Sequence, residues 1–158
     1  SEEGVGDPAD LVTLIDSAIA DNPENVDLWF GRGRIFYALK NYDESIASFK
    51  KVVELKPDLF EGNYYLGVFY TIKADEMNKV MNEKQYSSQT AYDTDLKEVN
   101  AVYMDAVPWF EKAYELKKDD VNTLDFLKSI CFRLRDEEGM MDKYNKYNTL
   151  LKEAKGEE

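Results

Sequence analysis

The chain repeats its pattern at an interval of 34 residues over most of its length. Pro23 and Pro57 lie 34 residues apart, and the positions around them match in kind. The matching pairs at this interval are Ile15 with Phe49, Ala18 with Val52, Gly33 with Gly67, and Phe36 with Tyr70. A fixed period of this length is typical of a helix–turn–helix unit. One unit cannot bury its apolar face alone, so such units stack into a solenoid.

The period divides the chain into units with definite boundaries. Residues 8–25 are predicted to form the second helix of an incomplete unit, and residues 26–59 form a full unit. Residues 60–120 are a second unit with 27 additional residues, and residues 121–154 are a third unit that closes the stack as a C-terminal cap. The prediction is a single all-α domain over residues 1–158, an α-α superhelix of about three repeats plus a leading helix.

The 27 additional residues predict an elongated helical hairpin in the second unit. Apolar residues recur among charges over residues 71–105, so the stretch stays helical in composition. Asp95 and Glu98 have the spacing of a capping box, which would open the second helix of the hairpin. Pro108 lies further along that helix, and its missing N–H predicts a kink or a restart near Asp105.

Gly33 and Gly67 are predicted to mark close crossings of antiparallel helices. Glycine inside a helix costs about 1 kcal/mol relative to alanine, so its recurrence at one place indicates a steric need. The modest-sized residues expected opposite the two glycines are Ser45, Val52, Ala106 and Ala113. No predicted strand precedes the segment 31–33, so its Gly-Arg-Gly sequence does not indicate a nucleotide-binding loop.

The negative charge of the chain disfavours some classes of binding partner. It carries 32 acidic and 20 basic residues, for a formal net charge of −12. Binding nucleic acid or an anionic lipid surface requires basic residues, so both partners are disfavoured. No apolar run is long enough to insert across a membrane. Basic or neutral proteins fit better, although solubility alone would explain much of the acidic excess.

The sequence offers little for catalysis or metal binding. There is no histidine and one cysteine, Cys131, which lies at a position of buried aromatic residues in the earlier units and is predicted to be a core residue. Zinc therefore lacks ligands. The acidic segments 93–95 and 119–122 lack the turn glycine and distal glutamate of a calcium loop. The other acids are scattered over solvated helix faces, so no catalytic residue, cofactor or metal is predicted and the chain is not expected to be an enzyme.

The repeated motif resembles the tetratricopeptide repeat. The residues that carry the resemblance are Trp29, Gly33, Phe36, Phe49, Val52 and Pro57. Asn63 and Lys118 depart from the family pattern, because they replace the opening aromatic and the closing proline of the second unit. The resemblance covers about residues 8–154. It implies a stack of helix pairs whose first helices line a concave wall that binds another protein or a peptide.

The last third of the chain is similar to a narrower group. Residues 106–113 and 134–145 resemble the C-terminal segment of tetratricopeptide proteins of Bacteroidetes, which are longer chains with a signal sequence and no assigned activity. The resemblance implies a piece of a larger protein that is periplasmic or exported in a Gram-negative bacterium. Ser1 in place of an initiator Met, and the missing first helix of the opening unit, fit this expectation.

The resemblance also implies which residues form the binding wall. The outward faces of the first helices would present Asp27, Phe30, Arg34, Tyr37, Tyr64, Val68, Thr71, Asn122, Asp125, Ser129 and Phe132. Aromatic residues and arginine are common anchors of protein interfaces, which suits a peptide or helix laid into a groove. The alternative is that Phe30 and Tyr64 only pack against neighbouring units. The clamp that some family members use for a chaperone's terminal carboxylate is not expected, since of its places only Arg34 has a suitable side chain.

Two further surfaces remain open as alternatives. The aromatic and methionine residues of the hairpin are Met77, Met81, Tyr86, Tyr92 and Tyr103. They form either a second contact surface or the seam between the two hairpin helices. A structural role is the rival function, in which the chain assembles, for instance as a homodimer, through the flank of residues 8–20 or through the hairpin.

Overall fold

The structure is a computed structural model that describes residues 6–157. These residues form seven α-helices and their connecting loops, with no strand among them. The helices are α1 (Pro8–Asp21), α2 (Val26–Ala38), α3 (Tyr42–Leu55), α4 (Phe60–Glu83), α5 (Gln89–Leu116), α6 (Val121–Arg133) and α7 (Met140–Ala154). The all-α prediction is confirmed. The terminal residues 1–4, which entered the sequence argument, lie outside the described part.

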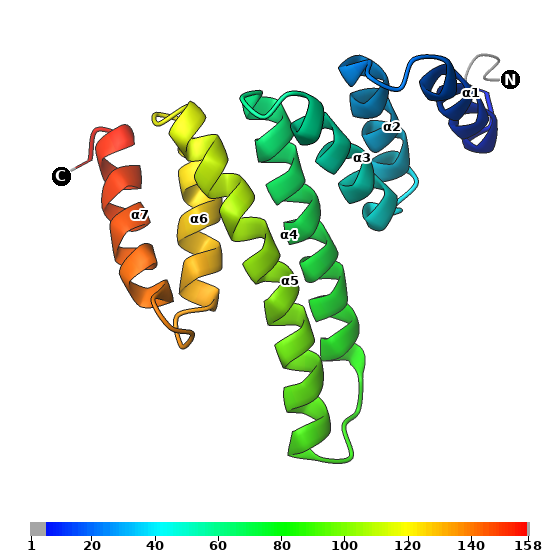
Figure 1. Cartoon of the computed structure of the whole chain (residues 1–158). Coiled ribbons are helices and arrows are strands. Elements are labelled where there is room, and N and C mark those ends of the chain that lie inside the picture. Colours follow the sequence, from blue (N-terminus) through cyan, green and yellow to red (C-terminus); the bar gives the residue numbers. More distant parts are fainter. Residues whose placement is uncertain (1–5, 158) are drawn as a thin grey trace, which may run out of the picture.

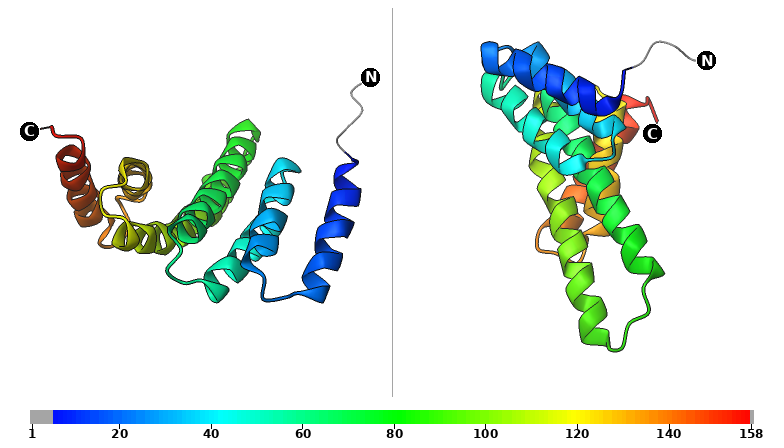
Figure 2. Two further views of the ribbon diagram at one scale, coloured as in Figure 1. Left: turned by 90° about the horizontal axis from the view of Figure 1, so that it is seen from above. Right: turned by 90° about the vertical axis from the view of Figure 1, so that its right-hand side faces the viewer.

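The helices stack as antiparallel pairs in a curved row from α1 to α7, with the two ends of the chain at opposite ends of the row (Figures 1 and 2). The closest associations are α2 with α3, α4 with α5, and α6 with α7. Each pair contacts the next through α3 and α4 or through α5 and α6. This succession is the α-α superhelix that the 34-residue period predicts.

Local sequence signals place the helix ends. The N-cap side chains of five helices accept a hydrogen bond from a backbone N–H in the first turn, and they are Asp7, Asn25, Asn41, Ser88 and Asp120. Such caps satisfy donors that have no partner within the helix. α1 ends at Asp21, before Asn22-Pro23, and α3 ends at Leu55, before Lys56-Pro57, as the proline positions predict.

The two repeated glycines make room for buried aromatic rings. A methyl group at Gly33 would overlap the ring of Phe49, and one at Gly67 would lie 2.9 Å from the ring of Phe110. Both rings are fully buried. The close crossing is as predicted, but the groups nearest to the missing side chains are aromatic rings and not the small residues expected there. A flat ring fills the space left by a missing side chain more completely than a second small residue does.

Of the small residues expected at these crossings, only Ser45 contacts its glycine directly. Ser45 Oγ donates a hydrogen bond to the carbonyl oxygen of Gly33 at 3.0 Å. Val52 instead lies against Gly62, where an added methyl group would be 3.1 Å from Cγ1 of Val52. Ala106 and Ala113 are buried in α5, but neither is among the atoms nearest to Gly67.

Asn63 preserves one interaction of the aromatic residue that it replaces. Trp29 Nε1 donates a hydrogen bond to the carbonyl oxygen of Pro23 at 2.7 Å. At the equivalent place in the next unit, Asn63 Nδ2 donates to the carbonyl oxygen of Pro57 at 3.0 Å. Both bonds tie a first helix to the proline turn that precedes it. The departure from the family pattern therefore keeps the hydrogen bond while it loses the ring.

The second unit forms the long hairpin that the insertion predicts. α4 has 24 residues and α5 has 28, whereas the other helices have 13 to 15. The ends of α4 and α5 project well beyond the neighbouring helices (Figures 1 and 2). At the tip, Asp95 accepts hydrogen bonds from Lys84 Nζ at 2.8 Å and from Tyr86 Oη at 2.7 Å.

The two helix starts expected within α5, at Asp95 and near Asp105, are absent. The helix begins at Gln89 with Ser88 as its N-cap, so Asp95 lies inside it and ties the tip together instead of capping a helix start. The helix also continues through Pro108 without a restart. Pro108 removes only one donor from the helix, and the buried Val107 and Phe110 beside it hold the helix against its neighbours.

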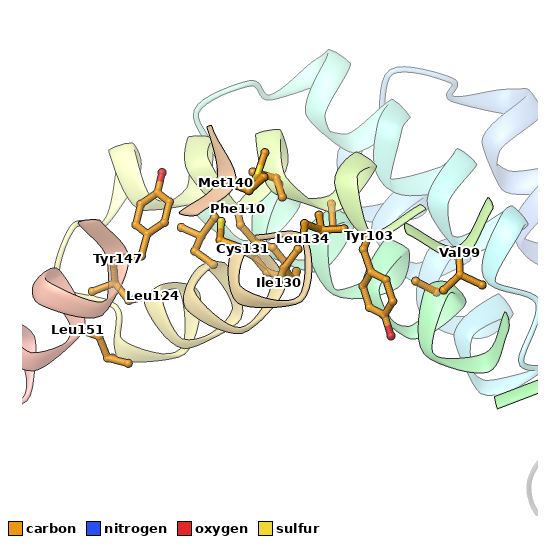
Figure 3. Packing of buried hydrophobic residues seen from close by; sticks show 14 of the residues in the cluster. Val99, Tyr103, Phe110, Leu124, Ile130, Cys131, Leu134, Met140, Tyr147 and Leu151 are labelled. Carbon is orange, nitrogen blue, oxygen red and sulfur yellow. The ribbon is translucent and has the colours of Figure 1, made fainter. Parts of the chain in front are cut away.

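The third unit packs without a glycine. Its equivalent position is Lys128, and Tyr144, the counterpart of Phe110, packs against Phe132 with ring centroids 5.1 Å apart. Met140 and Tyr147 are buried, as predicted for a terminal unit whose small positions are filled. Figure 3 shows Cys131 within the apolar cluster that continues from α4 to α7.

The glycine contact gives the first prediction. We expect Gly33→Ala to lower the free energy of unfolding by about 1–3 kcal/mol, because the added methyl group displaces the buried ring of Phe49. Gly31→Ala is the matched control, since its methyl group would meet only Ile15 Cδ1, at 3.8 Å, and should stabilise the helix by up to about 1 kcal/mol. Urea unfolding followed by circular dichroism measures both. Equal effects of the two substitutions would contradict the close crossing.

Candidate protein-binding face

A large apolar hollow opens between α1, α2 and α4. Its volume is about 960 Å³, and we call it the α2–α4 hollow. Four residues predicted for the binding wall line it, namely Phe30, Arg34, Tyr37 and Val68. It therefore lies on the face formed by the first helices α2, α4 and α6, which is the face expected to be concave. We call this the α2–α4–α6 face.

Aromatic rings packed edge-to-face or tilted form the floor of the α2–α4 hollow. Phe49 and Phe69 are buried, and their ring centroids are 4.9 Å apart. The ring of Phe30 lies 4.8 Å from that of Phe49. Tyr37 lies 5.5 Å from Phe69, and 46% of its surface is exposed. Phe30 thus both packs against the core and lines the hollow, whereas the ring of Tyr37 is exposed at the hollow.

The hollow contains residues that the sequence analysis missed. Leu11, Leu39 and Tyr65 line it, and all three are exposed. Leu11 comes from α1 and Leu39 follows the end of α2, so neither belongs to the predicted stripe. Tyr65 is adjacent to Tyr64 on α4, and this pair of tyrosines was the sequence feature that could have identified Tyr65 as a lining residue.

A smaller and more polar hollow lies between α4, α5 and α6. Its volume is about 310 Å³, and we call it the α4–α6 hollow. Three predicted residues, Thr71, Asp125 and Ser129, line it. Thr71 is only 7% exposed, and its hydroxyl donates to the carbonyl oxygen of Gly67 at 2.9 Å. Thr71 therefore forms part of the wall but does not offer its hydroxyl to a partner.

A polar network supports the α4–α6 hollow. Tyr103 Oη donates a hydrogen bond to Asp75, and burial together with this bond raises the pKa of Tyr103. The guanidinium of Arg133 lies 4.4 Å from the centre of the Tyr103 ring. Arg133 also donates to Asn78 at 2.9 Å and to Asn100 at 3.3 Å. These contacts tie α6 to both helices of the long hairpin.

α4 is the wall that the two hollows share. Tyr64, Val68, Thr71 and Asp75 follow one another at helical spacing along one face of α4. Val68 lines the α2–α4 hollow, whereas Thr71 and Asp75 line the α4–α6 hollow. Tyr64 lines neither of them. Its ring is partly buried among other aromatic rings, including Phe126 at 6.1 Å, so the packing interpretation describes it better.

The remaining predicted wall residues lie outside both hollows. Asp27 and Asn122 are exposed in the first turns of α2 and α6. Phe132 is 46% exposed near the end of α6, where it contacts Tyr144. Seven of the eleven predicted residues thus line one of the two hollows, and the other four line neither.

Sites for a metal or a membrane span were searched among the described residues. Residues 6–157 contain no cluster of three or more acidic, cysteine or histidine side chains that could hold a metal ion. Within the same range, no helix is both long and apolar enough to cross a bilayer. Cys131 is buried, and this burial raises the pKa of its thiol to about 11.

The environment of Cys131 gives the second prediction. A buried thiol with a raised pKa carries little of the reactive thiolate, so we expect almost no reaction with a disulfide reagent at pH 8 in the folded protein. The same protein in urea should react quickly and completely at its single thiol. Absorbance of the released thiolate measures both rates. Rapid labelling of the folded protein would contradict the assignment of Cys131 to the core.

Comparison with known proteins agrees with this architecture. The fold defines the class of α-α solenoids of stacked helix pairs. The family model described as tetratricopeptide repeat matches residues 2–59. Residues 2–59 are thus similar to the tetratricopeptide repeat family, and the later helix pairs continue the same superhelix. No curated protein sequence matches the chain.

Solved structures show the same fold at low sequence identity. MamA of strain MSR-1 is 18% identical with a TM-score of 0.58, and the match covers 92% of this chain and 68% of that one. MamA of strain AMB-1 is 19% identical with a TM-score of 0.56, and the match covers 92% of this chain and 61% of that one. The chain thus spans about two thirds of the length of these proteins.

Proposed function

We propose that this protein is a non-catalytic interaction scaffold that binds a segment of another protein on the α2–α4–α6 face. The observation that carries the proposal is the α2–α4 hollow, which exposes Tyr37 and Tyr65 over a floor of buried rings. Concave apolar sites lined by aromatic residues are the usual places where a ligand or partner is bound. Solenoids of helix pairs commonly use such an extended face for binding.

The chemistry of the hollow favours a bulky apolar side chain as the anchor. Full burial of such a side chain contributes about 1.5–3 kcal/mol, and tyrosine is among the residues that most often dominate binding energy. Arg34 is exposed at the hollow and makes no ion pair with any residue that the structure describes. Its side chain is therefore available to orient the partner through hydrogen bonds.

The residues that best test this function are the exposed ones. Alanine at Phe30 or Tyr64 would also remove packing against Phe49 or Phe110, so a loss of binding there would be confounded with a loss of stability. Tyr37 and Arg34 are exposed and line the hollow. Their replacement should leave the helix content unchanged.

The third prediction concerns binding of short random peptides displayed on phage. We expect selection on the immobilised protein to enrich peptides that carry a bulky apolar residue. For a synthetic copy of an enriched peptide, Tyr37→Ala combined with Arg34→Ala should weaken binding at least about tenfold, which corresponds to about 1.4 kcal/mol. Fluorescence anisotropy measures the affinity.

Met141→Ala is the control for this experiment, since Met141 is 46% exposed like Tyr37 but lies on α7, outside both hollows. It should leave the affinity unchanged. Failure to enrich any peptide, or equal binding to all three proteins, would contradict a binding role for the α2–α4 hollow.

Self-association is a second candidate function, and it is favoured by one feature of α1. Leu14 is 67% exposed, which makes it the most exposed large apolar residue described. If α1 is a contact between copies, sedimentation should show dimers at micromolar concentration, and Leu14→Lys should convert them to monomers. A monomer at all concentrations tested would remove this candidate and leave the scaffold function in place.

We further propose that the protein acts outside the cytoplasm of a Gram-negative bacterium. The support is the resemblance of residues 106–113 and 134–145 to exported tetratricopeptide proteins of Bacteroidetes. Fractionation of cells that produce the protein from its natural gene tests this location, and recovery from the cytoplasm alone would contradict it.

A further inference from the structure

The α4–α6 hollow differs in chemistry from its apolar neighbour. Asp75 from α4 and Asp125 from α6 both line it, and the only basic residue among its lining residues is Arg133. Arg133 is already engaged, because it donates hydrogen bonds to Asn78 and Asn100 and lies over the ring of Tyr103. The hollow therefore has two carboxylates and one guanidinium that is held by neutral groups.

Neither carboxylate lies within ion-pair distance of a described cation of the chain, Arg133 included. Asp75 and Asp125 make no ion pair with any residue among 6–157 that the structure describes. Asp75 is held in place at Oδ1 by the hydroxyl of Tyr103, which leaves acceptor capacity on its other oxygen. A carboxylate that is already oriented loses less conformational entropy when it binds a cation.

We propose that the α4–α6 hollow binds a lysine or arginine side chain of the same protein segment whose apolar residue occupies the α2–α4 hollow. The inference rests on the proposed scaffold function and names its partner class, a segment that combines a bulky apolar residue with a basic one. Asp75 and Asp125 accept hydrogen bonds from the cationic group, and the Ser129 hydroxyl is a further acceptor. The hollow of about 310 Å³ is small, which suits one long side chain and not a whole helix.

The shared wall gives the expected spacing between the two residues of the partner. Val68 lines the apolar hollow and Asp75 the acidic one, seven residues further along α4. Seven residues of helix rise about 10 Å. An extended segment advances about 3.3 Å per residue, so the basic residue should follow or precede the apolar anchor by about three positions.

The net charge of the whole protein also favours a basic partner segment. A formal net charge of −12 attracts basic segments and raises their rate of encounter at low ionic strength. It does not by itself select one site. The two carboxylates of the α4–α6 hollow add the position-specific part of the recognition.

The test selects the same phage library of random peptides on the wild-type protein and on Asp125→Lys. Asp125 is exposed, so its replacement should leave the circular dichroism spectrum unchanged. Peptides enriched on the wild type should carry lysine or arginine about three positions from a bulky apolar residue. A synthetic copy should bind Asp125→Lys about tenfold more weakly, because the attraction between Asp125 and the basic residue becomes a repulsion.

A charge-swapped peptide provides the sharpest measurement. Replacing its basic residue by glutamate should weaken binding to the wild type and restore binding to Asp125→Lys. Glu153→Lys, which makes the same charge change at an exposed position near the end of α7, is the control and should bind like the wild type. Raising the salt concentration should weaken binding of the basic peptide to the wild type more than it weakens binding of the charge-swapped peptide.

Each outcome decides between the two proposals. If apolar peptides are enriched without a basic residue, or if Asp125→Lys and Glu153→Lys bind equally well, the inference about the α4–α6 hollow is wrong while the scaffold function stands. If no peptide that depends on Tyr37 and Arg34 is enriched, the scaffold function fails and the inference fails with it.

Discussion

The packing of an aromatic ring against a helical glycine is the contact on which the rest of this structure depends. Phe49 fills the space at Gly33, and Phe110 fills the space at Gly67. The same Phe49 ring lies 4.9 Å from Phe69 and 4.8 Å from Phe30, so it also forms the floor of the α2–α4 hollow. One interaction therefore holds a helix pair together and shapes the surface that we propose to bind a partner.

Features that arise within a few residues of the chain were predicted best. The turns at Pro23 and Pro57 end α1 and α3 through local backbone geometry, so the 34-residue period located these helix ends. The aromatic rings beside the two glycines and the role of Asp95 were not predicted, because both depend on distances between helices. Asn63 shows that a residue outside the family pattern can keep the interaction of the residue it replaces. It donates a hydrogen bond to Pro57 just as Trp29 donates one to Pro23, although the two side chains differ in kind.

The candidate site was predictable only as far as the repeat extends. The stripe on α2 identified Phe30, Arg34 and Tyr37, because these positions recur with the family pattern. Leu39 follows the end of α2 and was missed. A residue beyond a helix end lines a hollow only if the neighbouring helices are inclined in a suitable way, and the sequence does not give that inclination. Asp75 was missed for another reason, because it belongs to the inserted hairpin and has no counterpart in the other units to reveal its place.

The most direct test of the central contact is a double-mutant cycle between Gly33 and Phe49, measured by urea unfolding. If the ring occupies the space of the missing side chain, Gly33→Ala should cost at least about 1 kcal/mol less when Phe49 is already replaced by leucine, because the smaller side chain makes room for the methyl group. An identical cost of Gly33→Ala in both backgrounds would show that the two residues do not contact each other and would contradict the account.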